Sequence, residues 1–286
     1  MNIGVLFENM DTADDACKAL FSDNGHILEF MDISYIYSPK RPELLSPAFK
    51  WCQVLPHLTF PGDAIRFSEG ADAVLIRNMD ELGMAKEEGI ELPLISDANL
   101  NIWNSFSLDL LDYFGISMYT APYELTLKEI QEAKEAFSPK EIPISVVAYG
   151  HLPLMITRQC SHINSGGECT RKTKHKSMLE QNSPIHDTLL TDRKGVSFHA
   201  ISYCRHCYNC IYNSVPISLI SMLQKLEKAK IDEIRLCFTI EKSSDIVAYI
   251  KDFISVLKGT GLDAVPSPKE KKSDSFTYGH IKNGVE

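Results

Sequence analysis

Five of the eight cysteines stand close enough in the sequence to form a metal site. Cys160 and Cys169 are nine positions apart, and Cys204, Cys207 and Cys210 follow as C-x-x-C-x-x-C in the run SYCRHCYNCIYNS. Three thiols at three-residue intervals can converge on one point, and thiolates are soft ligands that select zinc, copper(I) or iron–sulfur clusters. Such close cysteine runs are also typical of cluster proteins, so we expect the function to reside in this region.

The cysteines by themselves leave the kind of metal open. Four thiolates can hold zinc or a [4Fe–4S] cluster, and five cysteines leave one spare. A zinc ribbon more often carries paired C-x-x-C knuckles, whereas the first pair here is C-x8-C. A disulfide is the remaining alternative, although thiols or metal ligands are more common in a reducing compartment. Buried structural thiols are predicted for the other cysteines, Cys17, Cys52 and Cys237.

Hydrolytic machinery is not visible in the sequence. Cysteine catalysis needs a thiolate beside a base, and His162, His199 and His206 lie near the cysteines. However, no known thiol-protease signature surrounds them. Neither a G-x-S-x-G elbow nor an H-E-x-x-H zinc motif occurs in the chain.

The overall composition is that of a soluble globular protein, with 44% hydrophobic and 23% charged residues. No apolar run approaches the roughly 20 residues of a membrane helix. The first residues, MNIGVLFENMDTADD, carry acids early and no basic region, unlike a signal peptide. We therefore expect a cytoplasmic protein that does not associate with membranes. The net charge of −9 argues against a nucleic-acid binder that is basic over its whole surface.

The charge is nevertheless uneven along the chain. Between Thr157 and Ile211 there are eight basic and four acidic residues, together with five of the nine histidines. A solvated insertion loop would explain this composition. The alternative is a local basic surface that approaches an anionic partner, such as RNA or a small-molecule substrate.

Short apolar runs alternate with stretches of helical periodicity. The expected strands are Ile3–Glu8, Ile27–Ser34, Lys50–Pro56, Ala73–Arg77, Leu92–Ser96, Ile116–Thr120, Ile142–Tyr149 and Glu233–Ile240. The expected helices are Thr12–Phe21, Asp80–Glu88, Ser105–Phe114, Thr126–Phe137, Ile217–Ala229 and Ser244–Leu257. This alternation predicts a parallel sheet covered by helices, and eight strands predict an α/β fold, a TIM-like (β/α)8 barrel over residues 1–258. An open doubly wound sheet is the alternative, but no G-x-G-x-x-G follows the first strand.

One connection in this pattern is abnormally long. From Met155 to Pro216 no helix is evident that would return the chain to the sheet, so we expect a cysteine-rich loop, residues 156–216, inserted after the seventh strand. Loops of this length are usually functional or disordered. In a barrel it would lie on the face where active sites are found. Residues 259–286 are expected to form a polar tail that ends in FTYGHIKNGVE.

Several separated motifs together resemble the peptidase U32 family, in particular its larger bacterial members. They are YGHLPLMITRQC, LLTDRKGVSFHAISYCRHCYNCIYNSVPISL, GADAVLIRNMDEL, ISDANLNIWNS, TAPYELTLKEI, RLCFTIE and the ending FTYGHIKNGVE. The resemblance covers roughly residues 70 to 286, and the motifs keep the family's order. The larger relatives carry further sequence upstream, so the chain is similar to their C-terminal portion, and a longer relative is a possible partner.

The resemblance implies a cofactor and a chemistry. The family is named for collagenase-like proteolysis, but its better understood members resemble iron–sulfur proteins in oxygen-independent hydroxylation of tRNA, rRNA or a quinone precursor. It implies a [4Fe–4S] cluster, with zinc as the alternative, on Cys160, Cys169, Cys204 and Cys207, with Cys210 as the spare. It also implies polar site residues at strand ends, namely Asp97, Asn101, Asn104, Glu124, Arg235 and Glu241.

Two positions depart from the family pattern. Ser145 stands where the family usually has Glu, and Tyr278 stands where the ending usually has Arg. These changes remove an acid/base or ion-pair group and a guanidinium that could clamp an anion. They favour altered or lost chemistry on an intact cofactor site.

Simpler structural roles are alternatives for the polar residues. Helix capping near Ser105 is an equal alternative for Asn99, Asn101 and Asn104. Local interactions are the alternative for the others: a turn at Asp192–Gly195, a pair between Arg235 and Glu241, and local partners for His151 and His280. Tyr208, Asn209 and Tyr212 are expected to pack around the cysteines.

The preferred interpretation is an enzyme that uses a [4Fe–4S] cluster to modify RNA or a small molecule, with hydroxylation as the leading reaction. A peptidase is the second hypothesis and lacks a visible hydrolytic group. A non-catalytic cluster-binding or assembly subunit is the third, and the departures at Ser145 and Tyr278 favour it.

Overall fold

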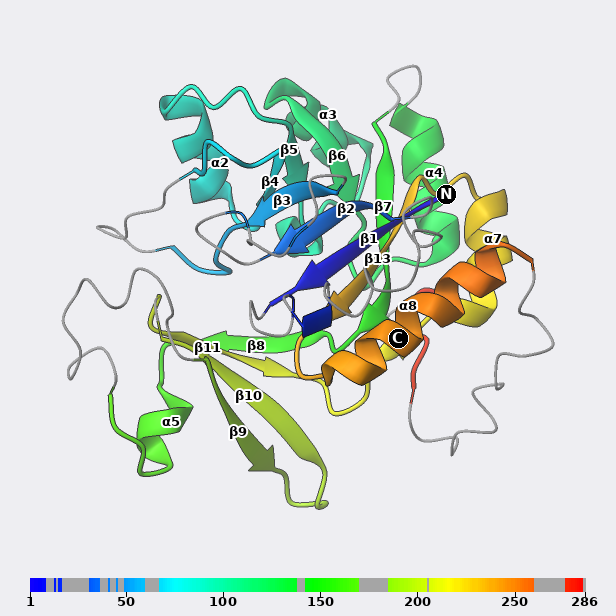
Figure 1. The fold of residues 1–286 in the computed structure, drawn as a ribbon. Coiled ribbons are helices and arrows are strands. Elements are labelled where there is room, and N and C mark those ends of the chain that lie inside the picture. The colour runs from blue at the N-terminus through cyan, green and yellow to red at the C-terminus, as the bar shows by residue number, and fades with distance from the viewer. Residues whose placement is uncertain are drawn as a thin grey trace.

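The computed structural model describes residues 1–8, 13, 15–16, 31–36, 41, 45, 49–59, 67–137, 142–169, 185–204, 206–259 and 276–284. Within these ranges, eight parallel strands close into a barrel (Figure 1). In spatial order they are β1 (Asn2–Phe7), β2 (Met31–Ile36), β3 (Lys50–Val54), β4 (Ala73–Ile76), β5 (Leu94–Ser96), β6 (Ile116–Thr120), β7 (Ile144–Gly150) and β13 (Glu233–Phe238). The predicted TIM-like barrel is therefore confirmed, and each expected strand occurs with its ends shifted by a few residues.

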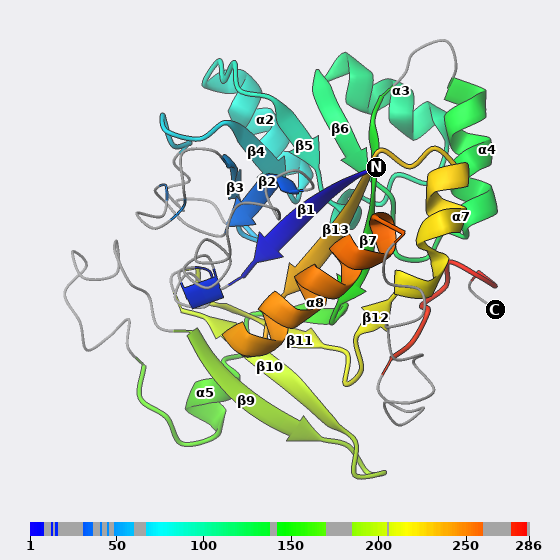
Figure 2. The ribbon, with the colours of Figure 1, turned by 45° about the vertical axis from the view of Figure 1, so that its right-hand side comes forward.

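Helices cover the outside of the barrel because their apolar faces pack on the strands. They are α2 (Met79–Glu87), α3 (Ser105–Tyr113), α4 (Leu127–Phe137), α7 (Leu223–Lys228) and α8 (Ser243–Leu257). For example, Tyr249 of α8 packs on Tyr149 of β7 with 4.5 Å between ring centroids, and Figure 2 shows α8 lying along this side of the barrel. Most of the expected helix Thr12–Phe21 lies outside the described residues.

The expected helix Ile217–Ala229 begins later than predicted. Its first residues form the short strand β12 (Ile217–Ser218), which pairs antiparallel with β7, and a 3-10 turn η3 (Ile220–Met222) precedes α7. Ile217 and Leu219 are buried, so their apolar character reflects pairing against the barrel rather than a helical face.

The barrel interior is apolar at its centre and charged along one side. Leu6, Leu75 and Ile95 form a small cluster inside the ring of strands, together with Tyr35, Cys52, Val54 and Ala73. Gly4 leaves room for the larger groups, because a Cβ there would lie 2.7 Å from the Tyr35 ring and 2.8 Å from Glu233. Glycine is thus required at position 4 because other side chains approach its backbone closely, and not because of its φ and ψ angles.

The connection from β7 to β13 is a second sheet and not the loop that we expected. It contains β8 (Pro153–Thr157), α5 (Ser161–Asn164), β9 (Ile185–Thr191), β10 (Ser197–Tyr203) and β11 (Tyr208–Tyr212). The strands pair antiparallel in the order β8-β11-β10-β9 and lie across one end of the barrel (Figure 1). The sequence suggested a loop because we searched for the helix that a parallel barrel requires, whereas antiparallel strands need only short turns.

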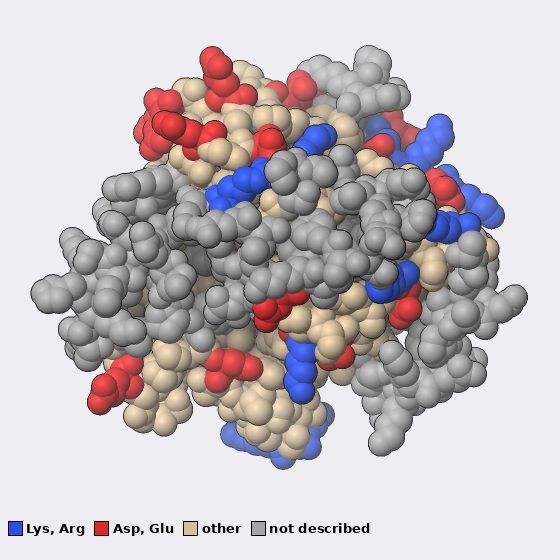
Figure 3. Space-filling model, viewed as in Figure 1, with Lys and Arg blue, Asp and Glu red and all other residues tan. Residues whose placement is uncertain are grey.

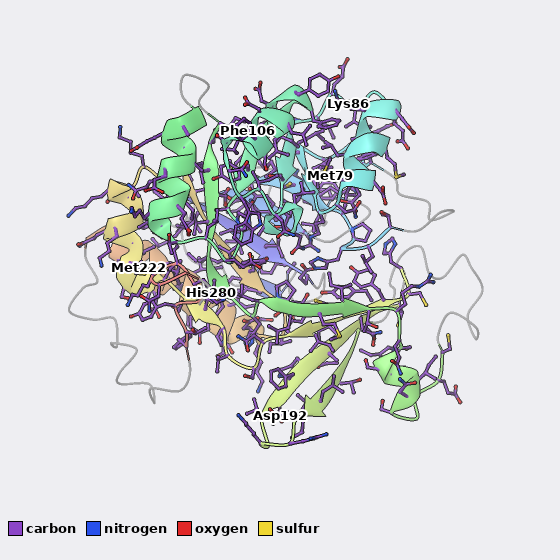
Figure 4. All side chains as sticks on the ribbon, turned by 180° about the vertical axis from the view of Figure 1, so that it is seen from behind. Met79, Lys86, Phe106, Asp192, Met222 and His280 are labelled. Atoms are coloured by element: carbon purple, nitrogen blue, oxygen red, sulfur yellow. The ribbon has the colours of Figure 1, made fainter. Side chains whose placement is uncertain are left out.

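The turn between β9 and β10 shows how this sheet forms. The Asp192 carboxylate accepts hydrogen bonds from the backbone N–H groups of Lys194 at 2.7 Å and Val196 at 2.9 Å. Gly195 has a φ of 80°, which other residues rarely adopt. The interpretation of Asp192–Gly195 as a turn is therefore confirmed, and Figure 4 shows Asp192 at the outer end of the hairpin.

The C-terminal segment folds back on the barrel over residues 276–284. Thr277 pairs with Ile217 as an isolated bridge, and Leu127 donates its backbone N–H to Ile281 at 3.0 Å. The linker-like run SPKEKKSDS lies outside the described residues. Among the helices described, none has both the length and the apolar composition that crossing a membrane requires.

Candidate functional site

Four cysteines line one pocket in the inserted sheet. Cys160 follows β8, Cys169 follows α5, and Cys204 and Cys207 lie between β10 and β11. The pocket is completed by Ile163, Ser202, Tyr203, Tyr208 and Asn209. The four residues that the family resemblance implied as ligands are thus brought together from two stretches, Cys160–Cys169 and Cys204–Cys207, that are 35 positions apart in the chain.

A tight hairpin presents two of these thiols. The antiparallel pairing of β10 and β11 ends at the pair Tyr203 and Tyr208, which leaves a four-residue connection with a cysteine at each end. The backbone N–H of His206 donates to the Tyr203 carbonyl at 3.2 Å and closes the turn. Cys207 has a φ of 56°, a left-handed conformation that costs free energy for a residue with a Cβ. Such strain is typical of functional sites, and here it places both thiols at the pocket.

Asn209 ties the hairpin to the segment that carries Cys160. Its Oδ1 accepts hydrogen bonds from Ser202 Oγ at 2.5 Å and Ser161 Oγ at 3.0 Å. Its Nδ2 donates to the carbonyl of Gln159 at 2.6 Å. Tyr208 and Asn209 line the cysteine pocket as predicted, whereas Tyr212 does not and packs instead with Cys210. Asn209 links the β10–β11 hairpin to the residues on either side of Cys160.

The segment between Cys160 and Cys169 is held by a pair of histidines. The His162 and His186 rings stack with 3.7 Å between centroids, and partial burial together with His162 lowers the pKa of His186. A Cβ on Gly167 would lie 2.3 Å from the His162 ring, so only glycine allows the chain to pass there. This packing brings the end of α5 toward β9.

The other described cysteines do not reach the pocket. Cys210 is buried with Ile201 and Tyr212, and burial raises the pKa of its thiol to about 12. Burial also raises the pKa values of Cys52 and Cys237 well above their ordinary value. Cys52 is buried, as predicted, whereas Cys237 is only partly buried, so its prediction as a buried thiol is confirmed only in part. Cys17 lies outside the described residues.

The thiols surround a space and do not converge on one point. Among the residues that the structure describes, no three Cys, His, Asp or Glu side chains lie close enough together to hold a single metal ion. The four sulfurs are soft donors on three separate segments, with apolar and aromatic walls between them. Four thiolates of this kind could hold zinc or an iron–sulfur cluster.

A second group of functional side chains lies at the carboxyl ends of the barrel strands. Arg77, just past β4, forms an ion pair with Glu8 past β1, and its Nε lies 3.1 Å from Asp97 Oδ2 past β5. All three are buried. Burial alone would raise the pKa of Glu8, but the Arg77 charge and His57 outweigh it and hold this pKa well below its usual range. Glu8 is therefore ionised at neutral pH.

His57 adds a neutral imidazole to this group. Its Nδ1 lies 2.9 Å from Asn99 Nδ2, which can only donate, so the proton of the neutral ring is on Nε2. Nε2 lies 3.6 Å from Glu8 Oε1, and no hydrogen-bond partner is present for it among the described residues. Burial and the Arg77 charge lower the pKa of His57. The ring is thus neutral, and its Nε2–H faces the Glu8 carboxylate.

Deeper in the barrel, Arg235 joins these groups to Glu233. Arg235 lies 3.5 Å from Asp97 Oδ1 and 3.2 Å from Glu233 Oε1, with its guanidinium carbon 4.0 Å from the Tyr35 ring centroid. Ser145 Oγ donates to Glu233 Oε1 at 2.6 Å. Position 145, where the family usually has Glu, therefore faces the Glu233 carboxylate. Ser145 donates a hydrogen bond to this carboxylate, whereas a Glu would repel it.

Arg235 and Glu241 do not pair with each other, so the alternative of a local pair between them is wrong. Glu241 Oε2 accepts the backbone N–H groups of Thr239 at 2.8 Å and Ile240 at 3.1 Å. Its Oε1 lies 3.9 Å from His151 Nε2. The two residues differ because Arg235 points into the barrel from within β13, whereas Glu241 folds over the end of that strand.

The inserted sheet covers the carboxyl end of the barrel with tyrosines. Tyr203 donates to Glu8 Oε2 at 3.3 Å and contacts the Tyr212 hydroxyl at 2.8 Å. Tyr208 accepts the backbone N–H of His57 at 3.2 Å and stacks on Tyr203 with 4.9 Å between centroids. Tyr203 and Tyr208 also line the cysteine pocket. This stacked pair therefore contacts the cysteine pocket as well as Glu8 and His57.

The remaining predicted site residues lie farther from this centre. Asn104 is exposed and caps α3, with its Oδ1 accepting the Ser107 N–H at 3.0 Å. Asn101 is exposed at the end of the 3-10 turn η1 (Ala98–Leu100), with a φ of 53°. Glu124 has a buried Oε2 without a hydrogen-bond partner in the described part of the chain. Of the six predicted polar residues, the structure joins Asp97 and Arg235 directly.

The lone histidines have local partners, as expected. His151 Nδ1 lies 2.6 Å from the Asn213 carbonyl, and His280 Nδ1 lies 2.9 Å from the Gly284 carbonyl. Tyr278, which replaces the family's usual Arg, lies 3.2 Å from Ser221 Oγ. Lys282 Nζ lies 3.3 Å from the Tyr278 ring centroid, so a cation is still present beside this position.

The basic insertion is described only in part. Arg193 and Lys194 are exposed at the end of the β9–β10 hairpin, where basic side chains are visible at the bottom of Figure 3. Arg158 is exposed after β8. The other basic residues of the predicted surface lie outside the described residues, namely Arg171, Lys172, Lys174, Lys176 and Arg205.

Sequence reasoning missed Glu8, His57, Arg77 and Tyr203. The first three directly follow β1, β3 and β4 or come within a few residues of their ends. The argument that selected Asp97, a polar residue at the carboxyl end of a predicted strand, applies to each of them. The contact of Tyr203 with Glu8 had no sequence signal, because it depends on how the inserted sheet folds onto the barrel.

Comparison with known families gave one match. The sequence model of Peptidase family U32 matches residues 64–265, which is more than half of the chain's 286 residues. The matched range includes the four cysteines of the pocket as well as Arg77, Asp97 and Arg235. A search of curated proteins gave no match.

Proposed function

We propose, from the premise that this chain belongs to peptidase family U32, that its cysteine pocket holds a [4Fe–4S] cluster that serves a modification reaction at the carboxyl end of the barrel. The observation that carries the proposal is the position of Cys160, Cys169, Cys204 and Cys207 around one pocket. Cys52 and Cys210, by contrast, are buried elsewhere, and the partly buried Cys237 packs against the cluster that contains Cys52. The chain thus separates four candidate ligands from its structural cysteines.

The shape of the pocket favours a cluster over zinc. Zinc requires four ligands around a single point, with each sulfur about 2.3 Å from the ion. A [4Fe–4S] cluster takes one thiolate at each iron, so its ligands are distributed around a volume. Ile163, Tyr203 and Tyr208 line the same pocket, and such walls limit solvent access, one of the factors that set a cluster's reduction potential.

The barrel residues would bind and orient the substrate. The cluster, when bound, would supply one-electron chemistry, which no side chain in the site offers. Ionised Glu8 can accept a hydrogen bond and neutral His57 can donate one from its Nε2–H, so the two groups could orient a polar group of the substrate. Arg77 holds Glu8 and Asp97 in position by ion pairs. We propose hydroxylation without molecular oxygen as the reaction type.

An anionic substrate fits the charge of the insertion. Arg158 is exposed two residues before Cys160, and Arg193 and Lys194 are exposed at the outer end of the β9–β10 hairpin of the same inserted sheet. Exposed lysines and arginines attract phosphates at long range. RNA is therefore the first substrate class to test, and anionic small molecules are the second.

The test uses anaerobically prepared protein with its cluster loaded and a two-electron acceptor present, because replacing a substrate C–H bond by C–OH with oxygen from water releases two electrons and two protons that the acceptor must take. It is incubated with tRNA, with rRNA and with anionic aromatic small molecules, and the products are examined by mass spectrometry. The proposal predicts the gain of one oxygen atom in one class, and no gain with Cys207→Ser protein. A loaded protein that modifies none of them but cleaves casein or gelatin would overturn the proposal in favour of a peptidase. A loaded protein inactive in every assay would leave a non-catalytic cluster-binding subunit.

A further inference from the structure

Helix α3 carries large apolar side chains on the face that points away from the barrel. The exposed fractions are 46% for Trp103, 83% for Phe106, 46% for Leu110 and 74% for Tyr113. Their spacing of three, four and three residues places them along one side of the helix, counting Trp103 just before its first turn. We call these four residues the α3 stripe, and Figure 4 shows Phe106 on this outer helix.

The stripe is not the face that attaches α3 to the barrel. Leu108 and Leu111, on the opposite side of the helix, are 2% and 0% exposed and belong to the main core. A surface helix normally has polar residues opposite its buried face. Single exposed hydrophobic residues are ordinary, but a continuous row of them marks an interaction surface.

The surroundings of the stripe are strongly acidic. From residue 79 to residue 113 the chain has eight acidic residues and one basic residue. The exposed acids are Asp80, Glu87, Glu88, Glu91 and Asp109. Figure 3 shows acidic side chains gathered over α2, next to this part of the fold. The rim of the stripe therefore attracts cations and repels anionic surfaces.

The single basic residue of this region is already engaged. Lys86 Nζ donates to the Tyr113 carbonyl at 3.4 Å and lies 4.8 Å from the Tyr113 ring and 4.9 Å from the Phe114 ring. It joins the end of α2 to the end of α3 without neutralising the outer acids. The positive charge that complements this surface must come from another molecule.

We propose that the α3 stripe binds a basic amphipathic helix of a protein partner. The stripe spans about three turns, or roughly 15 Å, which matches the length over which two packed helices contact each other. Apolar side chains of the partner would cover the four stripe residues, and its lysines or arginines would face the acids of α2 and α3. A second copy of this chain brings the same acids and is disfavoured, as is an anionic membrane.

This surface is distinct from the cysteine pocket and goes beyond the proposed reaction. None of its residues lines that pocket or contacts the Glu8 group. Loss of partner binding should therefore leave iron content unchanged, and loss of the cluster should leave partner binding unchanged. The two proposals can fail separately.

The test uses a synthetic peptide of about 18 residues, long enough to form a helix, with leucine on one face and lysine on the other. Trp103 reports binding, because it lies in the stripe, whereas the only other tryptophan, Trp51, is 0% exposed. Docking is expected to shift the Trp103 emission to shorter wavelength at micromolar peptide and to weaken as salt is raised. A peptide with the same leucines and glutamate for lysine is expected not to bind.

Stripe variants give the second readout, with an affinity measured from labelled peptide. The double change Phe106→Ser and Tyr113→Ser should weaken binding about tenfold or more. The matched control is Leu189→Ser on β9, a residue that is 59% exposed but remote from α3, and it should leave affinity unchanged. Unfolding curves for all variants check that the fold is retained.

Four results would overturn the proposal. One is equal binding of the acidic and basic peptides, since that would remove the charge argument. Another is unchanged affinity in a folded stripe double variant. The third is concentration-dependent dimerisation that Phe106→Ser abolishes, which would make a second copy the occupant. Binding to anionic vesicles in place of the basic peptide would likewise contradict it.

Discussion

Tyr203 donates a hydrogen bond to the carboxylate of Glu8, with 3.3 Å between the oxygens. The residue next to Cys204 therefore touches the charged group at the end of the barrel. Tyr203 also lines the cysteine pocket, so a single side chain belongs to both sites. This contact is the structural reason to treat the inserted sheet and the barrel as parts of one functional centre.

Replacing Tyr203 by Phe tests that connection. The Phe ring keeps the stack on Tyr208 but removes the hydroxyl that contacts Glu8 and Tyr212. We expect the free energy of unfolding to fall by about 1 kcal/mol, the usual net value of one hydrogen bond. Iron content should stay at the wild-type level, while product formation falls at least tenfold. Full activity in this variant would show that the contact is only structural, and Tyr113→Phe serves as an exposed control.

Serine substitutions separate the ligands from the spare cysteine. Cys160→Ser and Cys207→Ser remove thiols that line the pocket, so we expect loss of iron and sulfide from anaerobically purified protein. Cys210→Ser changes a buried thiol outside the pocket and should keep both. Iron and sulfide are measured per chain after folding has been checked by circular dichroism. Iron content that survives in the first two variants would contradict the ligand assignment.

Arg235→Met should strongly destabilise the barrel. The change leaves Glu233 and Asp97 buried without the guanidinium that now pairs with them. Breaking a buried ion pair costs about 3–5 kcal/mol, and urea unfolding measures this loss. Lys128→Met is the control, because its pair with Glu132 is exposed and is worth about 0.5 kcal/mol or less. Equal losses in the two variants would show that Arg235 is not neutralising buried charge.

Because of Glu81, we expect the free energy of unfolding of the protein to fall as the pH rises. It is buried in the first turn of α2, and burial raises the pKa of its carboxyl from 4.5 to about 8. The folded protein thus keeps a proton that the unfolded chain has lost. The contribution of Glu81 is fully present below pH 4.5 and is lost progressively as the pH rises to about 8.

Glu81→Gln should remove this pH dependence, because the amide stays neutral. The free energy of unfolding of the variant minus that of wild type should increase by a few kcal/mol between pH 5 and pH 8. Each unit of pKa shift is worth about 1.4 kcal/mol. Denaturant titrations at several pH values measure the difference, with the exposed Glu87→Gln as the control. A difference that is constant with pH would contradict the burial of a protonated carboxyl.

Much of the fold could be predicted because parallel barrel strands carry a local signal. Runs such as Ala73–Ile76 and Ile144–Gly150 are buried on both faces, so they are apolar throughout and recognisable in isolation. The inserted sheet lacked that signal. Its strands are only partly buried, as in Ser197–Tyr203, where the first residue is exposed and only the last four are buried, and they pair only with one another.

The parts of the candidate site that depend on residue type and spacing could be predicted from the sequence. The parts that depend on contacts between distant segments could not. Cysteine spacing together with the family resemblance selected the four residues that line the pocket and set Cys210 apart. The partners of Arg235 were not foreseen, since Glu233 reaches it from the same strand and Asp97 from across the barrel. Glu8 and His57 gain their pKa shifts from burial beside Arg77, which depends on the closure of the barrel.

The most direct test of the central claim is metal analysis of protein purified without oxygen. Absorbance is recorded, and iron, acid-labile sulfide and zinc are measured per chain. A [4Fe–4S] cluster on Cys160, Cys169, Cys204 and Cys207 predicts a brown protein with about four irons and four sulfides. Zinc without sulfide, or a colourless protein that takes up no iron on reconstitution, would contradict the cluster.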